Sequence, residues 1–150
     1  MLDLLNKDVI VYLLSFLPDN EKLKLTSVNK SMNCYKFFTK YDQIHDYEKI
    51  KSLSFYKNFR KIKHKAYNRQ IPSDITHLTF ADCFNQDIKD CIPFGVTDLT
   101  FGRWFNREIK DCIPSSVTHL VFGIYFDQEI EDFIPSSVTH LNLGYGLIKK

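Results

Sequence analysis

A repeated phrase of 21 residues occupies the second half of this 150-residue chain. Each copy is anchored by an Ile-Pro pair, with the prolines at positions 72, 93, 114 and 135. Two residues later the chain reads Ile/Val-Thr-His/Asp-Leu-x-Phe/Leu. Three full copies begin at Ile71, Ile92 and Ile113, and a shorter fourth begins at Ile134. A fixed period of this length is typical of solenoids, in which each repeat packs mainly against its neighbours.

Within each copy, the apolar positions predict a short strand followed by a turn. Leu78 and Phe80 alternate with polar residues, as in a strand with one buried face. Pro72 lies ahead of the strand, because proline donates no hydrogen bond to a sheet. We expect Phe84 and Ile88 to return to the core. The residues expected at the bend after the later strands are Gly102, Gly123 and Gly144.

One coil buries too few apolar side chains to offset the entropy of ordering its residues. We therefore expect the coils to stack, with parallel strands about 4.8 Å apart. An older, degenerate copy is hypothesised upstream. Its apolar positions, which keep the same internal spacing, are Ile50, Leu53, Phe55 and Phe59.

Polar residues recur at the same period and form columns in stacked coils. The threonine column is Thr76, Thr97, Thr118 and Thr139, and the second column is Asn85, Asn106 and Asp127. Because the closed turns of a coil leave backbone groups unpaired, we interpret these columns as hydrogen-bonding ladders rather than as catalytic groups.

A third column contains His77, Asp98, His119 and His140. It admits two hypotheses, a metal site formed by histidines on neighbouring strands or an exposed strand face that contacts a partner. We favour the exposed face, because it accommodates polar residues without a ligand, and expect no bound metal.

Cysteine usage predicts free thiols. No Cys-x-x-Cys pair is present. Cys91 and Cys112 share a column with Phe133. A position that takes either cysteine or phenylalanine is expected to be buried and apolar rather than nucleophilic.

The first 40 residues follow a helical period. The apolar positions of the first helix are Val9, Ile10, Leu13, Leu14 and Leu17. Asn6 is its expected N-cap, Asp8 lies in its first turn, and Pro18 ends it.

A second helix is expected to be capped by Asp19 or Asn20 and to carry Leu23, Leu25 and Val28. Ser31 is the expected start of a third, through Tyr35, Phe37 and Phe38. Helices this small usually need a neighbour or a partner. The excess apolar surface therefore either caps the solenoid or binds another protein.

Charge is divided unevenly along the chain. Residues 1–70 hold 14 Lys/Arg and 7 Asp/Glu, whereas residues 71–148 hold 4 and 11. This asymmetry predicts two modules with separate roles. Residues 49–69 hold eight Lys/Arg and no acid. Nucleic-acid binding or nuclear localisation is one hypothesis for this stretch, but we favour the solvated face of a degenerate coil, because the acidic repeats oppose nucleic acid as the main ligand.

Composition and motifs indicate a folded protein with no membrane span and no recognisable enzyme motif. Apolar residues make up 44% and charged residues 25% of the chain, as in folded globular proteins. No apolar run is long enough to span a bilayer, and the N-terminus lacks the pattern of a secretory signal, so we expect an intracellular protein with no membrane association. Neither a P-loop, a glycine-rich nucleotide fingerprint nor a nucleophile–base pattern is present. We therefore expect no enzymatic activity and no cofactor.

The 21-residue phrase resembles the FNIP repeat. The resemblance rests on FNQDIKDCIP at 84–93, FNREIKDCIP at 105–114 and FDQEIEDFIP at 126–135, and covers about residues 71–148. It implies a leucine-rich-repeat-like interaction module. Two departures are Phe94-Gly95 in place of Ser-Ser and a fourth copy that ends in NLGYGLIKK.

Residues 3–45 are similar to an F-box. The positions that match the family pattern are Leu5, Asp8, Leu13, Leu14, Ser15, Leu17, Leu23, Leu25, Val28 and Lys30. Asn6 stands where the family has proline, and Met32 where it often has tryptophan. An F-box followed by FNIP repeats is an arrangement known from amoebae and the large DNA viruses that infect them.

The two resemblances imply a substrate-recognition adapter of a cullin-type ubiquitin ligase. The F-box would dock an Skp-type adaptor through Leu5, Asn6, Leu13, Leu14 and Leu17. The repeats would bind a target protein through Thr76, His77, Thr79, Asp98, Thr100, His119, Val121, His140 and Asn142. The alternative is a repeat-based interaction module with no ubiquitin link, whose F-box-like helices only cap the solenoid. The expected location is the cytoplasm, of a host cell if the protein is viral, and a nuclear location stays open.

The expected fold class is α+β. A small three-helix F-box at 1–45 precedes a basic connector or degenerate first repeat at 46–70. FNIP repeats follow at 71–91, 92–112, 113–133 and 134–150, the last one partial. Together they predict a leucine-rich-repeat-like parallel β solenoid of about four 21-residue coils.

Overall fold

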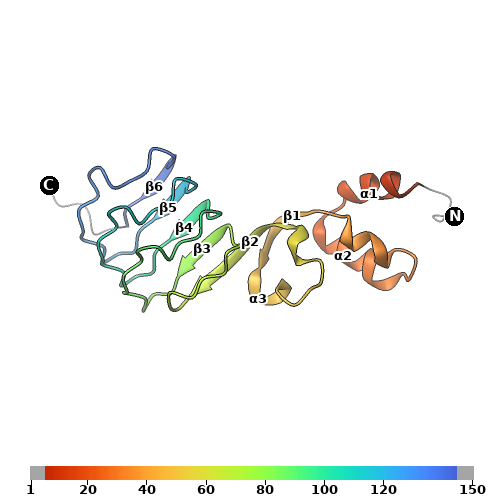
Figure 1. The fold of residues 1–150 in the computed structure, drawn as a ribbon, viewed down its shortest axis with the longest axis horizontal. Helices are drawn as coiled ribbons and strands as arrows, with labels where there is room; N and C mark the ends of the chain where they lie inside the picture. The colour runs from red at the N-terminus through yellow and green to blue at the C-terminus, as the bar shows by residue number, and fades with distance from the viewer. Residues whose placement is uncertain (1–5, 145–150) are drawn as a thin grey trace. The chain divides into compact units, whose positions relative to one another are not determined.

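The repeats form a parallel β solenoid in the computed structural model, which describes residues 6–144. Its strands are β2 (Phe59–Ala66), β3 (His77–Phe80), β4 (Asp98–Thr100), β5 (His119–Val121) and β6 (His140–Asn142). Each strand pairs in parallel with the next along the chain. Figure 1 shows these strands side by side, with the turns of the coils on the opposite side. The predicted solenoid is confirmed, and β2 adds a fifth strand to the four of the repeats.

The register of the strands follows the 21-residue period. Leu78 lies opposite Leu99, and Leu99 lies opposite Leu120. All three leucines are at most 1% exposed, whereas Leu141 in the last coil is 44% exposed. Each leucine is therefore covered by the coil that follows it, as stacking requires.

Phenylalanine columns fill the interior. Phe80, Phe101 and Phe122 stack with ring centroids 5.4 and 5.2 Å apart. Within each coil this ring also contacts the second phenylalanine, as between Phe101 and Phe105 at 4.1 Å. Phe84 and Ile88 are buried as expected. Aromatic stacking thus continues from coil to coil through the core.

Glycine follows the strands of the later coils because their backbones pass very close there. A Cβ atom on Gly102 would lie 2.1 Å from the carbonyl oxygen of Ala81, and one on Gly123 would lie 2.0 Å from that of Gly102. At Gly102 and Gly123 the requirement is for space at the bend, whereas Gly144 has a φ of 62°, which favours glycine by itself.

The polar columns form the predicted ladders. The amides of Thr97, Thr118 and Thr139 each donate to the carbonyl of the threonine one coil earlier, at 2.8 to 2.9 Å, and the Thr76 amide donates to the Ile62 carbonyl. The Asn85 side chain accepts from the Asn106 amide, and Asn106 accepts from the Asp127 amide, both at 3.0 Å. These contacts satisfy backbone donors in turns, which supports the structural interpretation of both columns.

The strand of the degenerate copy upstream of the repeats was predicted at the wrong residues. The strand that pairs with β3 is β2, in which His64 lies opposite Leu78 and Ala66 opposite Phe80. Leu53 and Phe55, which the spacing placed on a strand, lie outside any strand. The coil between β2 and β3 is shorter than 21 residues, because Lys63 pairs with His77. The 21-residue spacing therefore does not locate the strand of this coil.

The chain divides into two compact units between Lys61 and Ile62, within β2. The first contains α1 (Lys7–Ser15), α2 (Asp19–Val28), the 3₁₀ helix η2 (Asn33–Phe37), β1 (Tyr41–Asp46), α3 (Tyr47–Ile50) and the 3₁₀ helix η3 (Tyr56–Asn58). The expected third helix is thus a short 3₁₀ segment. The domain boundaries drawn from the sequence stay predictions.

Asn6 caps α1 as expected, because its side-chain oxygen accepts from the Asp8 amide at 3.1 Å. The predicted cap of α2 is wrong. Pro18 is the N-cap, with no side-chain hydrogen bond, and Asp19 is the first helical residue. Proline fits there because its φ is preset and it has no amide hydrogen to leave unpaired.

The buried face of α2 is polar rather than apolar. Its buried residues are Asp19, Lys22 and Thr26. Of the apolar residues expected on this helix, Leu23 is half-buried, whereas Leu25 and Val28 are 45% and 78% exposed. The helix therefore packs by hydrogen bonds and presents its leucine and valine outward.

Asp19 organises a buried charge cluster. Its carboxylate lies 3.0 Å from Lys22 Nζ, 3.0 Å from His45 Nε2 and 2.7 Å from the Gln43 amide. Lys22 Nζ also donates to the Lys40 carbonyl at 3.0 Å. The cluster joins the start of α2 to β1, so it fixes the helix within its unit. Burial alone raises the pKa of Asp19, but hydrogen bonds from His45, Gln43, Lys22 and Asp42 outweigh it and leave the pKa below its ordinary value.

We predict that Gly123→Ala lowers the free energy of unfolding by about 3 kcal/mol, because the added methyl group overlaps a backbone carbonyl that cannot move away. Gly95→Ala is the matched control, since its Cβ would lie 3.3 Å from the nearest oxygen. Urea unfolding followed by circular dichroism measures both. Equal effects of the two substitutions would contradict the packing of the coils.

We predict that Asp19→Asn lowers the free energy of unfolding by about 3 kcal/mol, because it leaves the Lys22 cation buried without its carboxylate. Adding Lys22→Met to this variant is expected to recover most of the loss. A double variant no more stable than Asp19→Asn in urea unfolding would show that the ion pair does not carry the effect.

The lowered pKa of Asp19 also predicts acid lability of the helical unit. The unfolded chain binds a proton near the ordinary value of 3.8, whereas the folded carboxyl binds it only at lower pH. The stabilisation is therefore present in full above about pH 5 and is lost as the pH falls through about 4 and below. Unfolding of the wild type and Asp19→Asn across this range measures it, and a similar loss in both would contradict the assignment.

Candidate functional site

An apolar groove opens on the helical unit. Its volume is about 280 Å³. The residues that line it are Ile10, Leu13, Leu14, Leu17, Leu25, Asn29 and Met32. Ile10, Leu14 and Met32 form the small core beneath it, and Leu17 and Tyr35 pack against that core. Leu13 and Leu25 are 50% and 45% exposed, so the walls of the groove face solvent.

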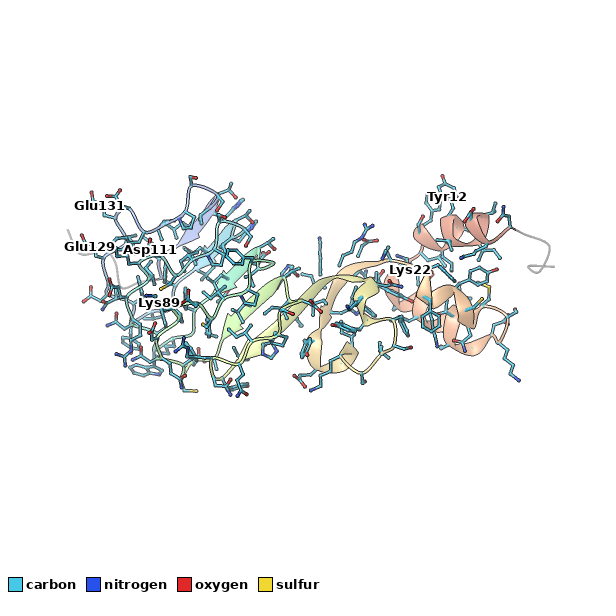
Figure 2. The ribbon with its side chains drawn as sticks, in the orientation of Figure 1. Tyr12, Lys22, Lys89, Asp111, Glu129 and Glu131 are labelled. Atoms are coloured by element: carbon cyan, nitrogen blue, oxygen red, sulfur yellow. The ribbon has the colours of Figure 1, made fainter. Side chains whose placement is uncertain are left out.

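Further large apolar side chains of α1 are exposed. Tyr12 and Phe16, one helical turn apart, are 64% and 68% exposed, and their rings meet edge to face at 4.9 Å. Figure 2 shows Tyr12 projecting away from α1. The sequence analysis left out both residues, although their spacing of four places them on one helix face. Tyr12 and Phe16 line neither this groove nor the groove along α2, and two exposed aromatic side chains side by side are a candidate contact surface of their own.

A second groove, of about 440 Å³, runs beside the first along α2. It is lined by Leu17, Glu21, Lys24, Leu25, Val28 and Asn29. Leu17, Leu25 and Asn29 line both grooves. The apolar surface is thus bordered by charged groups, as is usual for a protein interface with a polar rim.

The predicted adaptor-binding residues occupy different places on this surface. Leu13, Leu14 and Leu17 all line the groove. Leu14 is only 3% exposed and also belongs to the core below the groove. Asn6 is exposed and its side chain caps α1. Leu5 lies outside the described residues.

The second surface is the outer face of the strands. The register places His77, Asp98, His119 and His140 in one row, preceded by Lys63 of β2. A parallel row contains Lys65, Thr79, Thr100, Val121 and Asn142. Their side chains are exposed or half-buried. We call these ten residues the outer strand face. It includes all the predicted target-binding residues except Thr76, whose hydroxyl accepts from the Ile62 amide ahead of β3.

Each member of the histidine row is held by the threonine before it. The Thr76 hydroxyl lies 2.7 Å from His77 Nδ1, and the equivalent contacts of His119 and His140 are 2.9 Å. The Thr97 hydroxyl donates to Asp98 at 2.7 Å. Asp98 also lies 3.5 Å from His77 and 3.8 Å from His119. The row is therefore ordered before any partner binds.

The metal hypothesis gains no support from this geometry. Among residues 6–144 no group of three or more histidine, cysteine, aspartate and glutamate side chains is placed to hold a metal ion. His119 and His140 instead stack ring on ring, with centroids 4.2 Å apart. The exposed-face interpretation accounts for the row.

The cysteine column is half-buried rather than buried, which corrects the sequence expectation. Cys91, Cys112 and Phe133 all keep part of their surface in solvent, because they lie at a turn. All four cysteines are free thiols, as expected. Burial raises the pKa of both Cys91 and Cys112, and nearby carboxylates raise that of Cys112 further. The thiols are therefore protonated and weakly nucleophilic at neutral pH.

The structure also exposes an aromatic pair that the sequence analysis did not single out. Trp104 and Tyr125 occupy one column of the turn after the strands and stack at 4.3 Å. They are 52% and 44% exposed. The Arg103 guanidinium lies 5.7 and 5.5 Å from the two rings. Their spacing of 21 residues was visible in the sequence, but the first copy has Cys83 there.

The basic stretch includes β2. Lys63 and Lys65 are exposed on one face of this strand, while Ile62 and Ala66 are buried on the other. This agrees with the solvated outer face of a coil. No helix among the described residues has the length and apolar character needed to cross a membrane.

A helical unit with an apolar groove, followed in the chain by a parallel β solenoid of 21-residue coils, defines a solenoid repeat protein. The FNIP repeat family matches residues 67–104 and 105–146, which is just over half of the chain. The chain therefore belongs to the FNIP repeat family.

Relatives in Acanthamoeba polyphaga mimivirus share this region. A provisionally named F-box protein is 34% identical over 88 residues, which are 55% of this chain and 41% of the relative. A provisionally named F-box and FNIP repeat-containing protein is 32% identical over 107 residues, covering 60% of this chain and 36% of the relative. The chain thus spans less than half the length of these relatives.

A solved structure described as a novel circular LRR protein is also similar. It is 36% identical, with a TM-score of 0.47, over 56% of this chain and 14% of that protein.

Proposed function

We propose that this protein is a substrate-recognition adapter of a cullin-type ubiquitin ligase. Its F-box-like helices dock an Skp-type adaptor, and its FNIP repeats hold a target protein. The names of the mimivirus relatives support the F-box assignment. The apolar groove on the helical unit is the observation that carries the proposal.

The groove fits the docking of an apolar partner element. Its walls are half-exposed leucines, and it is nearly free of polar surface. Leaving such a surface in water is unfavourable, and a partner helix that fills the groove removes it from solvent. The charged Glu21 and Lys24 beside it supply a rim that favours one orientation of the partner.

Asn6 supports the same docking geometry although it replaces the proline of the F-box pattern. Its φ of −58° lies in the range that proline imposes. The backbone at the start of α1 therefore already has the conformation that proline would give. The asparagine adds a side-chain cap to the helix.

The chain contributes no chemistry to ubiquitin transfer in this proposal. A solenoid fold is typical of interaction modules, and its repeats offer a target surface on the outer strand face. Holding target and ligase core together raises the effective concentration of one for the other. The F-box at 1–45, the connector at 46–70 and action in the cytoplasm of a host cell remain parts of this proposal.

We predict that Leu13→Asp with Leu25→Asp weakens adaptor binding at least about tenfold, because charge is placed on both walls of an apolar interface. Isothermal titration calorimetry with a purified Skp-type adaptor measures this. The control is Ile44→Asp, which changes an apolar residue of similar exposure (50%) on β1.

Wild-type binding that is absent at high adaptor concentration, or equal binding by both variants, would contradict the adaptor role. Circular dichroism of the double variant separates the alternatives. A double variant that unfolds would point to the interaction module with no ubiquitin link, in which these helices serve only as part of the fold.

A further inference from the structure

Charge is segregated between the two sides of the solenoid. On the strand side, Lys63 and Lys65 are exposed at one end of the outer strand face, and Asp98 is the one acidic residue in the described strands β2 to β6. The turn side is strongly acidic and includes Asp87, Asp90, Glu108, Asp111, Glu129 and Glu131. Figure 2 shows Asp111, Glu129 and Glu131 on these turns, away from the strands.

Neighbouring polar side chains partly compensate the negative charge of Asp98. Its carboxylate lies between His77 and His119 and accepts from the Thr97 hydroxyl. The two lysines lie on β2, two strands away from it in the sheet order. The outer strand face therefore carries net positive charge at its β2 end.

Several side chains of the outer strand face are already ordered, which reduces the conformational entropy lost when a partner binds. Three histidine rings are held by threonine hydroxyls, and two of them stack on each other. The second row adds the hydroxyls of Thr79 and Thr100 and the amide of Asn142. Side chains that are ordered before binding lose less entropy when a partner arrives.

We propose that the outer strand face recognises an acidic polypeptide segment. This proposal rests on the proposed function, since it names the chemical class of target that the repeats hold. Carboxylates of the segment pair with Lys63, Lys65 and the histidine row, while the excess of acidic residues on the turns disfavours docking on the opposite side of the solenoid. Nucleic acid fits less well, because neither row of the face carries a phenylalanine, tyrosine or tryptophan, and the rings of His119 and His140 already stack on each other.

The first test uses the full chain and a fluorescein-labelled peptide of alternating glutamate and serine. Fluorescence anisotropy at low salt is expected to show binding, and Lys63→Glu with Lys65→Glu to weaken it about tenfold. Asp98→Asn is expected to tighten it about twofold, since it removes the one acid from the face. The matched control is Lys89→Glu with Lys110→Glu, which reverses two exposed lysines of the turns.

The second test removes the three histidine rings. His77→Gln combined with His119→Gln and His140→Gln keeps polar side chains in the row, and it is expected to weaken binding of the Glu-Ser peptide several-fold at neutral pH. Full binding by this triple variant would show that the histidines do not contact the acidic segment.

No binding of the Glu-Ser peptide, equal loss in the two double-lysine variants, or tighter binding of single-stranded poly-thymidine than of the peptide would overturn the proposal. Adaptor binding is measured on the same samples. If it persists while the peptide fails to bind, the acidic-target inference falls and the adapter role stands. If peptide binding persists while adaptor binding is absent, the adapter role falls instead.

Discussion

Stacking of one coil on the next is the constraint on which the repeat unit depends. A coil of 21 residues cannot bury its apolar side chains alone, and the nearly complete burial of Leu78, Leu99 and Leu120 is supplied by the following coil. The bend after each strand must then be narrow, which the contact between Gly123 and the Gly102 carbonyl shows most directly. The same stacking aligns polar residues into ladders, which supply hydrogen bonds to backbone groups of the turns. The 21-residue period therefore determines which residues lie in the core, which bind the backbone and which lie on the surface.

Because every coil repeats the same path, each position in the phrase becomes a row on the surface. Side chains on the outer strand face do not form the stacked core, so the residue type can vary there, as between His77, Asp98 and His119.

The helical unit is held together differently from the solenoid. Its buried cluster of Asp19, Lys22 and His45 fixes α2 by hydrogen bonds, which leaves Leu13 and Leu25 available to a partner. The protein thus combines two separate surfaces, an apolar one on helices and a polar one on strands.

The period predicts most of the solenoid from sequence. Strand positions, the burial of Phe84 and Ile88, and the ladders all follow from it, because each coil repeats its neighbours' contacts. The helical unit is less predictable. Asp19 was expected only as a helix cap, and Lys22 was not singled out. Their burial depends on contacts with Gln43, His45 and Lys40, which lie far along the chain and which no local pattern indicates. The position of β2 was not predicted, because its many lysines hide the alternation of buried and exposed residues in its sequence. The groove was predicted in part, through Leu13, Leu14 and Leu17, while Leu25 was not among the predicted adaptor-binding residues.

Hydrogen–deuterium exchange of the full chain with and without a purified Skp-type adaptor tests the central claim most directly. The adapter account predicts that the adaptor protects backbone amides in α1 and α2, from Lys7 to Val28, and leaves the exchange of β3 to β6 unchanged. Protection of the repeat strands with no change in the two helices, or no protection anywhere at saturating adaptor, would contradict it.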